Sequence, residues 1–381
     1  MISLASKLPN VGTTIFSVMS QLATEHDAIN LSQGFPDFEC PPELVSLVSK
    51  NMKKGHNQYA PMPGLLSLRE RIAEKINTLH SASYHPETEI TVTAGGTQAI
   101  FTALTAVIQP NDEVIILEPA YDCYSPSIKL LGGLVKSFEL SAPDYKIDWE
   151  MFKKLISSRT RMIILNSPHN PTGMILTEDD IRELTRLTHN TDILILSDEV
   201  YEHIIFDDKP HLSMARFPEL RERSFIVASF GKLFHNTGWK MGYCAGPAWL
   251  MAEFRKVHQF LVFSVNTPVQ HALAEFMMDK NVYMDLIDFY QQKRDSFSKL
   301  MLQTRFDLLP CHGSYFQCVT YRRIAEEGDM EFAKRLTTDY GVAGIPVSAF
   351  YSRKNEAQVL RFCFAKKQET LEKAVERLIK V

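Results

Sequence analysis

The chain has 381 residues, of which 45% are hydrophobic, and its formal net charge is -4. This length exceeds what one hydrophobic core usually supports, so we expect two domains. The Lys and Arg residues are dispersed, which disfavours binding to nucleic acid or to an anionic membrane, and no apolar run is long enough to span a bilayer. The N-terminal residues lack a secretion signal, so a cytoplasmic location is expected. The six cysteines and twelve histidines show no zinc-type spacing, and no metal site is predicted.

The order of apolar patterns predicts an α/β fold. Five leucine and isoleucine residues between 65 and 79 recur at helical spacing. Strand-like runs then alternate with helical patterns from about residue 90 to about residue 250, as in a mostly parallel sheet covered by helices. Later helical segments and a strand at 359–364 indicate a smaller α+β unit. We therefore expect a large domain over 46–280 and a small C-terminal domain over 281–381.

A glycine pair follows the first strand of this sheet. Residues 94–97 join the strand at 90–93 to a helix at 98–108. The backbone N–H groups of Gly96 and Thr97 would point at an anion such as a phosphate, because they open a helix. By itself, a glycine pair more often serves only to turn the chain.

Polar or aromatic residues follow two further strands. The strand at 161–165 leads into the turn 166–173, in which two prolines favour a rigid path and Asn170 would present its amide. Tyr121 follows another strand, where its ring would either stack on a flat ligand or pack into the core.

An acid ends the apolar run at 192–197. Asp198 would lie at the carboxyl end of a buried parallel strand, where open α/β sheets bind ligands. An ionised carboxylate there could keep a pyridine nitrogen protonated. The alternative is a helix N-cap. If Asp198 faces such a ring nitrogen, Tyr201 and Asn170 would both reach a phenolic oxygen on the same ring.

A lysine in a glycine turn follows the strand at 225–230. Desolvation and the nearby cation Lys240 would favour a neutral Lys232 amine, which can form a Schiff base. A lone loop lysine is usually a solvated charge, but Ser229 and Lys240 would here complete a phosphate shell. A lysine, a ring acid and a phosphate shell together predict pyridoxal 5'-phosphate as the cofactor. Arg361, on a strand predicted to be half-buried, would bind a substrate carboxylate through its planar fork.

These motifs resemble those of the class I aminotransferases, which are pyridoxal-phosphate enzymes of fold type I. The resemblance spans nearly the whole chain and is carried by Gln58, Tyr59, Gly95, Gly96, Thr97, Tyr121, residues 166–173, 198–201 and 229–240, and Arg361. The segments 32–37, 237–243, 257–259 and 344–350 resemble the methionine and kynurenine aminotransferase branch more than the aspartate-specific branch.

The resemblance implies a role for each matching position. Lys232 would be the Schiff-base lysine, Asp198 the partner of the pyridinium nitrogen, and Tyr201 a third member of the catalytic set. The cofactor would be bound by Gly96, Thr97, Tyr121, Asn170, Asp198, Tyr201, Ser229, Lys232 and Lys240, with Tyr59 from the opposite subunit of a homodimer. The substrate would be bound by Gly34, Asn170, Arg361, Phe16 and Phe35. Residues 1–45 would form an N-terminal arm that packs with the small domain.

Two positions depart from related branches. Lys240 stands where the aspartate-specific branch has arginine, so a point charge replaces a fork. Phe16 stands where the kynurenine branch often has tryptophan.

The expected activity is transfer of an amino group from an apolar, sulfur-containing or aromatic L-amino acid to a 2-oxo acid, by double displacement. Phe16, Phe35, Tyr59 and Tyr121 suggest an apolar, aromatic-rich pocket, and the matching motifs offer no candidate second arginine for a dicarboxylate side chain. Methionine, aromatic amino acids and kynurenine are therefore the expected donors, and methionine is favoured because the resemblance is closest to the methionine aminotransferase branch. Kynurenine transamination and a cysteine-conjugate β-lyase activity are the alternatives. A pyridoxal-phosphate sensor that binds DNA is disfavoured, because the chain has no spare length for a DNA-binding module.

Overall fold

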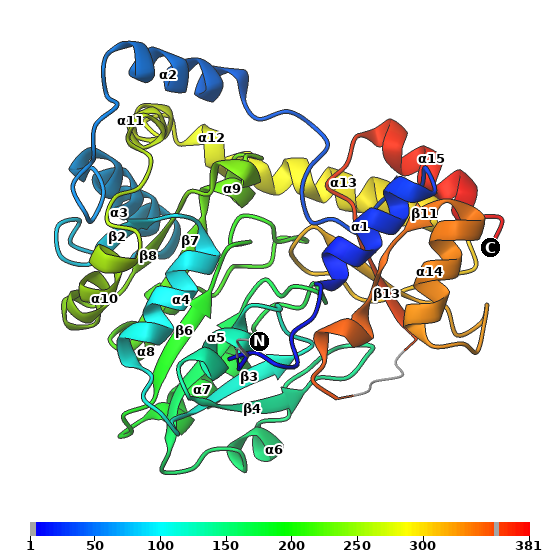
Figure 1. The fold of residues 1–381 in the computed structure, drawn as a ribbon, viewed down its shortest axis with the longest axis horizontal. Helices are drawn as coiled ribbons and strands as arrows, with labels where there is room; N and C mark the ends of the chain where they lie inside the picture. The colour runs from blue at the N-terminus through cyan, green and yellow to red at the C-terminus, as the bar shows by residue number, and fades with distance from the viewer. Residues whose placement is uncertain (1–4, 354–357) are drawn as a thin grey trace, which may run out of the picture.

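A seven-stranded sheet forms the centre of the larger unit in the computed structural model, which describes residues 5–353 and 358–381 (Figure 1). Strand β8 runs antiparallel to both of its neighbours, and the other pairings are parallel. The predicted α/β architecture with a mostly parallel sheet is therefore confirmed. In sheet order the strands are β2 (Ile90–Thr93), β8 (Gly242–Ala245), β7 (Ser224–Ser229), β6 (Leu194–Asp198), β5 (Thr160–Asn166), β3 (Glu113–Glu118) and β4 (Leu134–Glu139).

Both faces of this sheet are apolar, which is why its strands read as continuous hydrophobic runs. Along β3, Val114 and Ile116 belong to the core under α4 and α10, whereas Ile115 and Leu117 face the core on the opposite side. The helices of the larger unit are α2 (Pro42–Lys53), α3 (Leu66–His80), α4 (Gly96–Val107), α5 (Tyr124–Leu130), α6 (Trp149–Lys153), α7 (Glu178–Thr188), α8 (Pro218–Arg221), α9 (Phe230–Leu233), α10 (Ala248–Leu261) and α11 (Thr267–Phe276), with 3₁₀ turns η1 (Met214–Arg216) and η2 (Thr237–Trp239).

A smaller antiparallel sheet lies beside the larger unit. Its strand order is β12 (Ile345–Pro346), β13 (Val359–Cys363), β10 (Phe316–Thr320) and β9 (Asp307–Leu308). Helices α12 (Asn281–Met284), α13 (Leu286–Met301), α14 (Asp329–Tyr340) and α15 (Gln368–Leu378) and the 3₁₀ turn η3 (Val347–Phe350) complete the C-terminal part.

The N-terminal region lies against this C-terminal part. Helix α1 (Ile15–Glu25) packs near α14 in Figure 1, and β1 (Ile29–Asn30) pairs in parallel with β11 (Val342–Ala343). The domain boundaries at 45/46 and 280/281 remain predictions.

Several loops meet at one edge of the large sheet. Strands β3, β5, β6 and β7 are parallel, so the segments after their last residues share an edge. Gly242 at the start of β8 pairs with both Thr93 and Ser229, the last residues of the two neighbouring strands. The chain before β8, which contains Lys240, therefore reaches the same edge.

Two local expectations are corrected. Strand β13 is buried at every position rather than half-buried, because the N-terminal segment covers the side that was expected to face solvent: Cys363 N–H donates to Leu31 O, and Arg361 donates to Ser32 O. The glycine turn expected around Lys232 is the one-turn helix α9, since the N–H of Phe234 donates to the carbonyl of Phe230.

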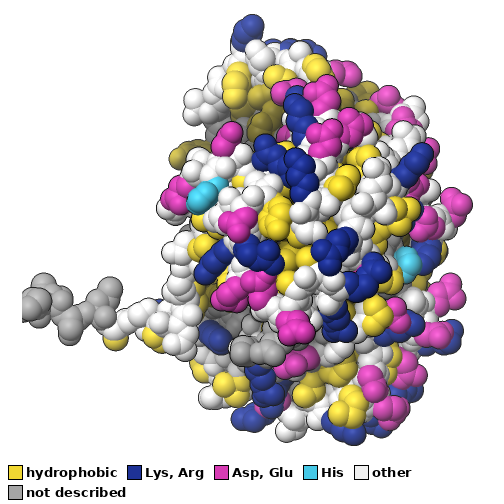
Figure 2. Space-filling model, turned by 90° about the vertical axis from the view of Figure 1, so that its right-hand side faces the viewer, with side chains coloured by type: hydrophobic (Ala, Val, Ile, Leu, Met, Phe, Trp, Pro, Cys, Tyr) yellow, Lys and Arg dark blue, Asp and Glu magenta, His cyan; other side chains and the backbone are white. Residues whose placement is uncertain are grey.

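The distribution of charged side chains on the surface and the hydropathy of the helices fit the composition of the chain. On the face drawn in Figure 2, basic and acidic side chains are interspersed. No helix of the described residues is long and apolar enough to cross a membrane. The cysteines of the described chain are free thiols.

Candidate active site

A cavity of about 250 Å³ opens at the shared edge of the large sheet, against the smaller sheet. It collects segments that are far apart in the sequence. Its walls are formed by Phe16, Gln33, Gly34, Gly95, Gly96, Thr97, Ile100, Tyr121, Asn166, Asn170, Asp198, Val200, Tyr201, Ser229, Gly231, Lys232, Thr237, Lys240, Met241, Phe316 and Arg361.

Lys232 projects into this cavity from α9. Its Nζ donates to the carbonyl of Gly34 at 3.0 Å and to the hydroxyl of Tyr315 at 2.8 Å. Burial lowers the pKa of Lys232 to about 8, and the cations Arg361 and Lys240 act in the same direction. The amine is therefore poised to lose its proton near neutral pH, as a nucleophile or a general base requires.

Asp198 lies at the end of β6 and is 3% exposed. Tyr124 donates to its Oδ2 at 2.5 Å, and the N–H of Val200 donates to Oδ1 at 3.3 Å. Burial raises the pKa of this carboxyl to about 6. A turn rather than a helix follows, so Asp198 is not a helix N-cap. Its carboxylate has a cavity wall on one side and would be stabilised there by a cationic ring nitrogen.

Asn170 and Tyr201 complete this part of the wall. Asn166 donates to the carbonyl of Asp198 at 2.9 Å and accepts from the N–H of Asn170 at 2.7 Å, which fixes the turn after β5 beside β6. Burial raises the pKa of Tyr201 well above its ordinary value, so its hydroxyl stays a hydrogen-bond donor.

Arg361 is completely buried on β13 and makes no ion pair within the described part of the chain. Its Nη1 donates to Asn170 Oδ1 at 2.7 Å and its Nη2 donates to the carbonyl of Ser32 at 2.8 Å. The guanidinium carbon lies 3.8 Å from the ring centroid of Phe316. Arg361 Nε finds no hydrogen-bond partner among residues 5–353 and 358–381. A buried cation with an unused N–H at a cavity is suited to bind a carboxylate.

The other end of the cavity is suited to a phosphate. Gly95 precedes α4 with φ +82°, a backbone conformation that favours glycine, and contributes no side-chain cap to the helix. The first N–H groups of α4 therefore face the cavity together with the dipole of the helix. Ser229 and Lys240 line the same end, and the hydroxyls of Thr97 and Tyr121 lie 3.3 Å apart.

Two residues expected at the site do not line this cavity. Tyr59 is 81% exposed and packs edge-on against Phe263 in a separate surface recess. Phe35 is 46% exposed, with Lys366 Nζ 4.8 Å from its ring centroid. The other predicted site residues are all brought together at the cavity wall.

Sequence reasoning missed three aromatic residues. Tyr124 bonds Asp198, Tyr315 bonds Lys232, and Phe316 lies against Arg361. Tyr124 lies three residues after Tyr121 and could have been found from that spacing. Tyr315 and Phe316 follow the turn residues Gly313 and Ser314, and nothing in that short segment marks a site.

The fold and the cavity define an enzyme that binds a phosphate-bearing cofactor and a carboxylate substrate, and known proteins agree. Residues 26–378 match the family model "Aminotransferase class I and II". Methionine aminotransferase of Escherichia coli is 48% identical over 98% of this chain and 97% of its own length. Human kynurenine–oxoglutarate transaminase 1 is 32% identical over 94% of each chain.

Solved structures give the same assignment. A crystal structure of an Escherichia coli protein with methionine aminotransferase function has a TM-score of 0.97 and 46% identity, and covers 100% of both chains. Aspartate aminotransferase of Thermus thermophilus has a TM-score of 0.90 at 28% identity, also over 100% of both chains. The chain belongs to the class I and II aminotransferases. It is a pyridoxal-phosphate-dependent transaminase.

The residues of the cavity fit pyridoxal phosphate. The uncapped start of α4 and Lys240 suit its phosphate, the buried Asp198 suits its ring nitrogen, and the Lys232 amine suits its aldehyde.

Proposed function

We propose that this enzyme transfers the amino group of methionine, or of an aromatic L-amino acid, to a 2-oxo acid. The single observation that carries the proposal is the buried Arg361, which makes no ion pair among the described residues and lies at one end of the cavity beside aromatic rings. Phe16 and Phe316 line the cavity there, and Arg361 is the only arginine among its described lining residues. The 48% identity to a methionine aminotransferase supports the same donor.

Each proposed step uses a group with defined contacts. Arg361 and Asn170 bind the carboxylate of the amino acid, with the backbone of Gly34 beside it, and this orients the Cα–H bond toward Lys232. Lys232, with its lowered pKa, takes the Cα proton of the amino acid as general base in the first half-reaction. In the second half-reaction it donates a proton back to Cα of the new amino acid. The cofactor supplies a ring that accepts the electron pair released at Cα.

The remaining groups hold the cofactor in this proposal. Asp198 would keep the ring nitrogen protonated, while Asn170 and Tyr201 would donate to the phenolic oxygen. Tyr121 would supply an aromatic face for the ring. Gly96, Thr97, Ser229 and Lys240 would bind the phosphate. The amino group stays on the enzyme between the two half-reactions. Double-displacement kinetics, with parallel lines in double-reciprocal plots, are therefore expected.

The experiment that tests the donor is a half-reaction. Holoenzyme is mixed with methionine without any 2-oxo acid, and the visible absorbance of the bound cofactor is followed. We expect one equivalent of absorbance change and of 2-oxo acid per site. Phenylalanine and aspartate serve as comparison donors, and a higher specificity constant for aspartate would contradict the apolar-pocket argument.

Two alternatives remain on the same scaffold. Kynurenine–oxoglutarate transaminases match this chain at 31–32% identity, which supports kynurenine as a second donor. A β-lyase acting on cysteine conjugates would release pyruvate and ammonia without an acceptor. Assaying ammonia in the absence of any 2-oxo acid separates the lyase from the transaminase.

We also propose a cytoplasmic homodimer with two-fold symmetry. The exposed Tyr59 and Phe263 suit a subunit contact, and Tyr59 would reach the phosphate of the partner subunit. Sedimentation of the holoenzyme tests the dimer.

A further inference from the structure

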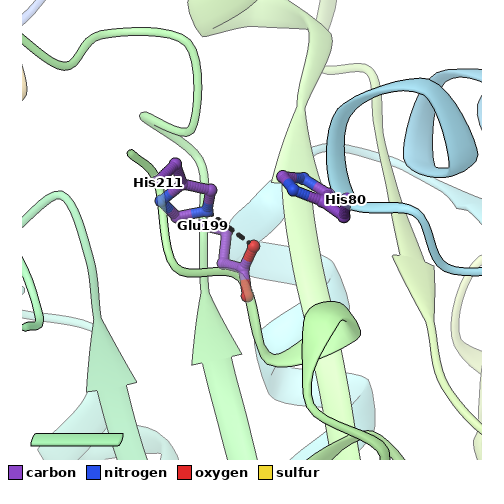
Figure 3. A group of neighbouring side chains, drawn as sticks. All are labelled: His80, Glu199 and His211. Atoms are coloured by element: carbon purple, nitrogen blue, oxygen red, sulfur yellow. Dashed lines mark hydrogen bonds and ion pairs between the residues drawn. The ribbon is translucent and has the colours of Figure 1, made fainter. Parts of the chain in front are cut away.

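A second cluster of polar side chains lies buried behind Asp198 and contributes nothing to the cavity wall. It consists of His80, the last residue of α3, Glu199, which follows β6, and His211, in the loop before η1. Figure 3 shows the two imidazole rings on either side of the Glu199 side chain. One nitrogen or oxygen atom from each residue can be chosen so that all three lie within 4.8 Å of one another.

The hydrogen bonds in this cluster are unevenly distributed. Glu199 is well supplied: Oε2 accepts from His211 Nε2 at 2.8 Å, and Oε1 accepts from Ser197 Oγ at 2.8 Å and from the N–H of Met214 at 3.1 Å. His80, in contrast, has no hydrogen-bond partner on either ring nitrogen in the part of the chain that the structure describes. A buried imidazole without any partner is costly, and a ligand on one of its nitrogens removes that cost.

The charges around the cluster favour a cation. Glu202 lies 3.6 Å from His80 Nε2 through its Oε2, and its Oε1 accepts from Lys75 Nζ at 2.5 Å. Two carboxylates, those of Glu199 and Glu202, thus lie beside the two imidazole rings, and Lys75 bonds only the second of them. A cation bound between the rings would be attracted by both carboxylates.

We propose that His80, Glu199 and His211 bind a zinc ion. Two imidazole nitrogens and one carboxylate oxygen are a donor set that Zn²⁺ prefers, and three protein ligands leave a fourth position for water. Bonds of about 2.0 Å in a tetrahedral site separate ligand atoms by roughly 3.3 Å. The 2.8 Å between His211 Nε2 and Glu199 Oε2 would therefore widen by a small shift, and the proton on Nε2 would move to Nδ1.

Such an ion would have a structural effect on the reaction site. It would connect the end of α3, the residue after Asp198 and the loop before η1, three segments that are distant in sequence. The ion would thus hold the turn that carries Asp198, while leaving the cavity itself unchanged.

The test begins with the metal content of wild-type holoenzyme. Protein prepared without a polyhistidine tag is dialysed against metal-free buffer and analysed by inductively coupled plasma mass spectrometry, and about one zinc per chain is expected. Metal-depleted holoenzyme is then titrated with ZnCl₂, which should raise the melting temperature. Titration with CoCl₂ should give the visible d–d bands of tetrahedral cobalt, a signature measured on the wild-type protein itself.

Variants locate the ion. His80→Gln and His211→Gln should each weaken zinc binding by roughly 100-fold or more, the upper end of what changes around a metal site cause. His258→Gln is the matched control, because His258 is also buried and also has an unpartnered Nε2 among the described residues, but lies on α10. It should bind zinc like wild type. The proposal is overturned if wild-type protein shows neither zinc, nor a thermal shift, nor cobalt bands. It is also overturned if His80→Gln and His211→Gln bind zinc as tightly as the control.

Discussion

At the scale of single residues, burial brings the pKa values of Lys232 and Asp198 closer together. The pKa of Lys232 falls from 10.5 to about 8 and the pKa of Asp198 rises from 3.8 to about 6, in each case first because of desolvation. The charged form of each side chain is therefore destabilised by desolvation unless an oppositely charged or reactive group is bound beside it. A pyridinium nitrogen would offset the cost at Asp198, and an aldehyde would remove the charge at Lys232.

The raised pKa of Asp198 makes a prediction for protein from which the cofactor has been removed. Its folded-state carboxyl binds a proton more tightly than the unfolded one, so wild type loses stability as the pH rises from 3.8 to about 6. Asp198→Asn carries no such proton. The stability of the variant relative to wild type should grow across this window and level off above it, by on the order of 3 kcal/mol.

Urea unfolding of cofactor-free protein at several pH values between 4.5 and 8 measures this difference. With pyridoxal phosphate bound the order should reverse, because wild type then gains a charge pair that the variant lacks. A constant difference across the whole pH range would contradict the assigned pKa of Asp198.

Tyr315 is predicted to position the catalytic amine. Its hydroxyl accepts from Lys232 Nζ at 2.8 Å and donates to the carbonyl of Gly34. Tyr315→Phe keeps the ring and removes this hydroxyl, so proton transfer at Cα should slow by about tenfold, the effect of roughly 1.4 kcal/mol. Single-turnover rates with Cα-deuterated methionine measure that step, and the isotope effect should increase. Unchanged rates together with an unchanged isotope effect would remove Tyr315 from this role.

The residues that could be predicted from sequence share one property. Asp198, Lys232 and Asn170 each follow a strong apolar strand pattern, so a local signal placed them at the edge of the sheet. Tyr315 has no such signal, because its contact with Lys232 joins positions 83 residues apart. His80 and Glu199 are likewise distant in sequence, and local zinc spacings could not reveal them.

At the scale of elements, β8 is the strand that brings together the groups proposed to bind the phosphate. Its first residue, Gly242, pairs with Thr93 on one side and with Ser229 on the other. A side chain at this position would meet Ala228 O at 2.6 Å and the backbone of Gly95 at 3.1 Å. The glycine thus allows the start of α4 and the end of β7 to approach one another.

Gly242→Ala should therefore weaken cofactor binding. The added Cβ meets backbone atoms that cannot rotate away, so the turn at Gly95 has to move, at a cost of about 1–3 kcal/mol. We expect the dissociation constant for pyridoxal phosphate to rise by about tenfold or more, measured by fluorescence titration. Gly238→Ala is the control, because a Cβ at Gly238 meets no atom within 4 Å. Equal affinities in the two variants would contradict this account.

Element boundaries followed from the sequence where the chemistry was local. Thr177 and Asp180 form a capping box that begins α7, a pattern of residues close in sequence, and the spacing from 65 to 79 corresponds to α3 at Leu66–His80. The direction of β2 and β8 was not predictable, because strand direction depends on pairing between distant segments. The full burial of β13 was missed for the same reason, since its cover comes from the N-terminal segment.

At the scale of the whole molecule, Tyr59 lies away from the cavity of its own chain, as expected if it serves a partner. Mixing Tyr59→Ala with Lys232→Ala subunits tests this proposal. Mixed dimers would carry one site with both groups intact, so a random mixture should regain about a quarter of the wild-type activity. The assay uses a limiting concentration of cofactor, and each variant mixed with itself is the control. No gain, with subunit exchange verified by native mass spectrometry, would place Tyr59 outside the partner's site.

Arg361 stands on the small sheet, but it bonds Asn170 of the large unit and Ser32 of the N-terminal segment, and Phe316 covers its guanidinium face. Its fork is therefore fixed relative to Lys232 by contacts from three parts of the chain. The fixed distance between Arg361 and Lys232 has to match the distance between the carboxylate and the amine of the substrate. An α-amino acid carries both groups on one carbon, whereas a β- or γ-amino acid separates them by further methylene groups. With the carboxylate held at Arg361 as proposed, the longer backbones would carry their amines past Lys232, so the enzyme would select α-amino acids independently of the side chain.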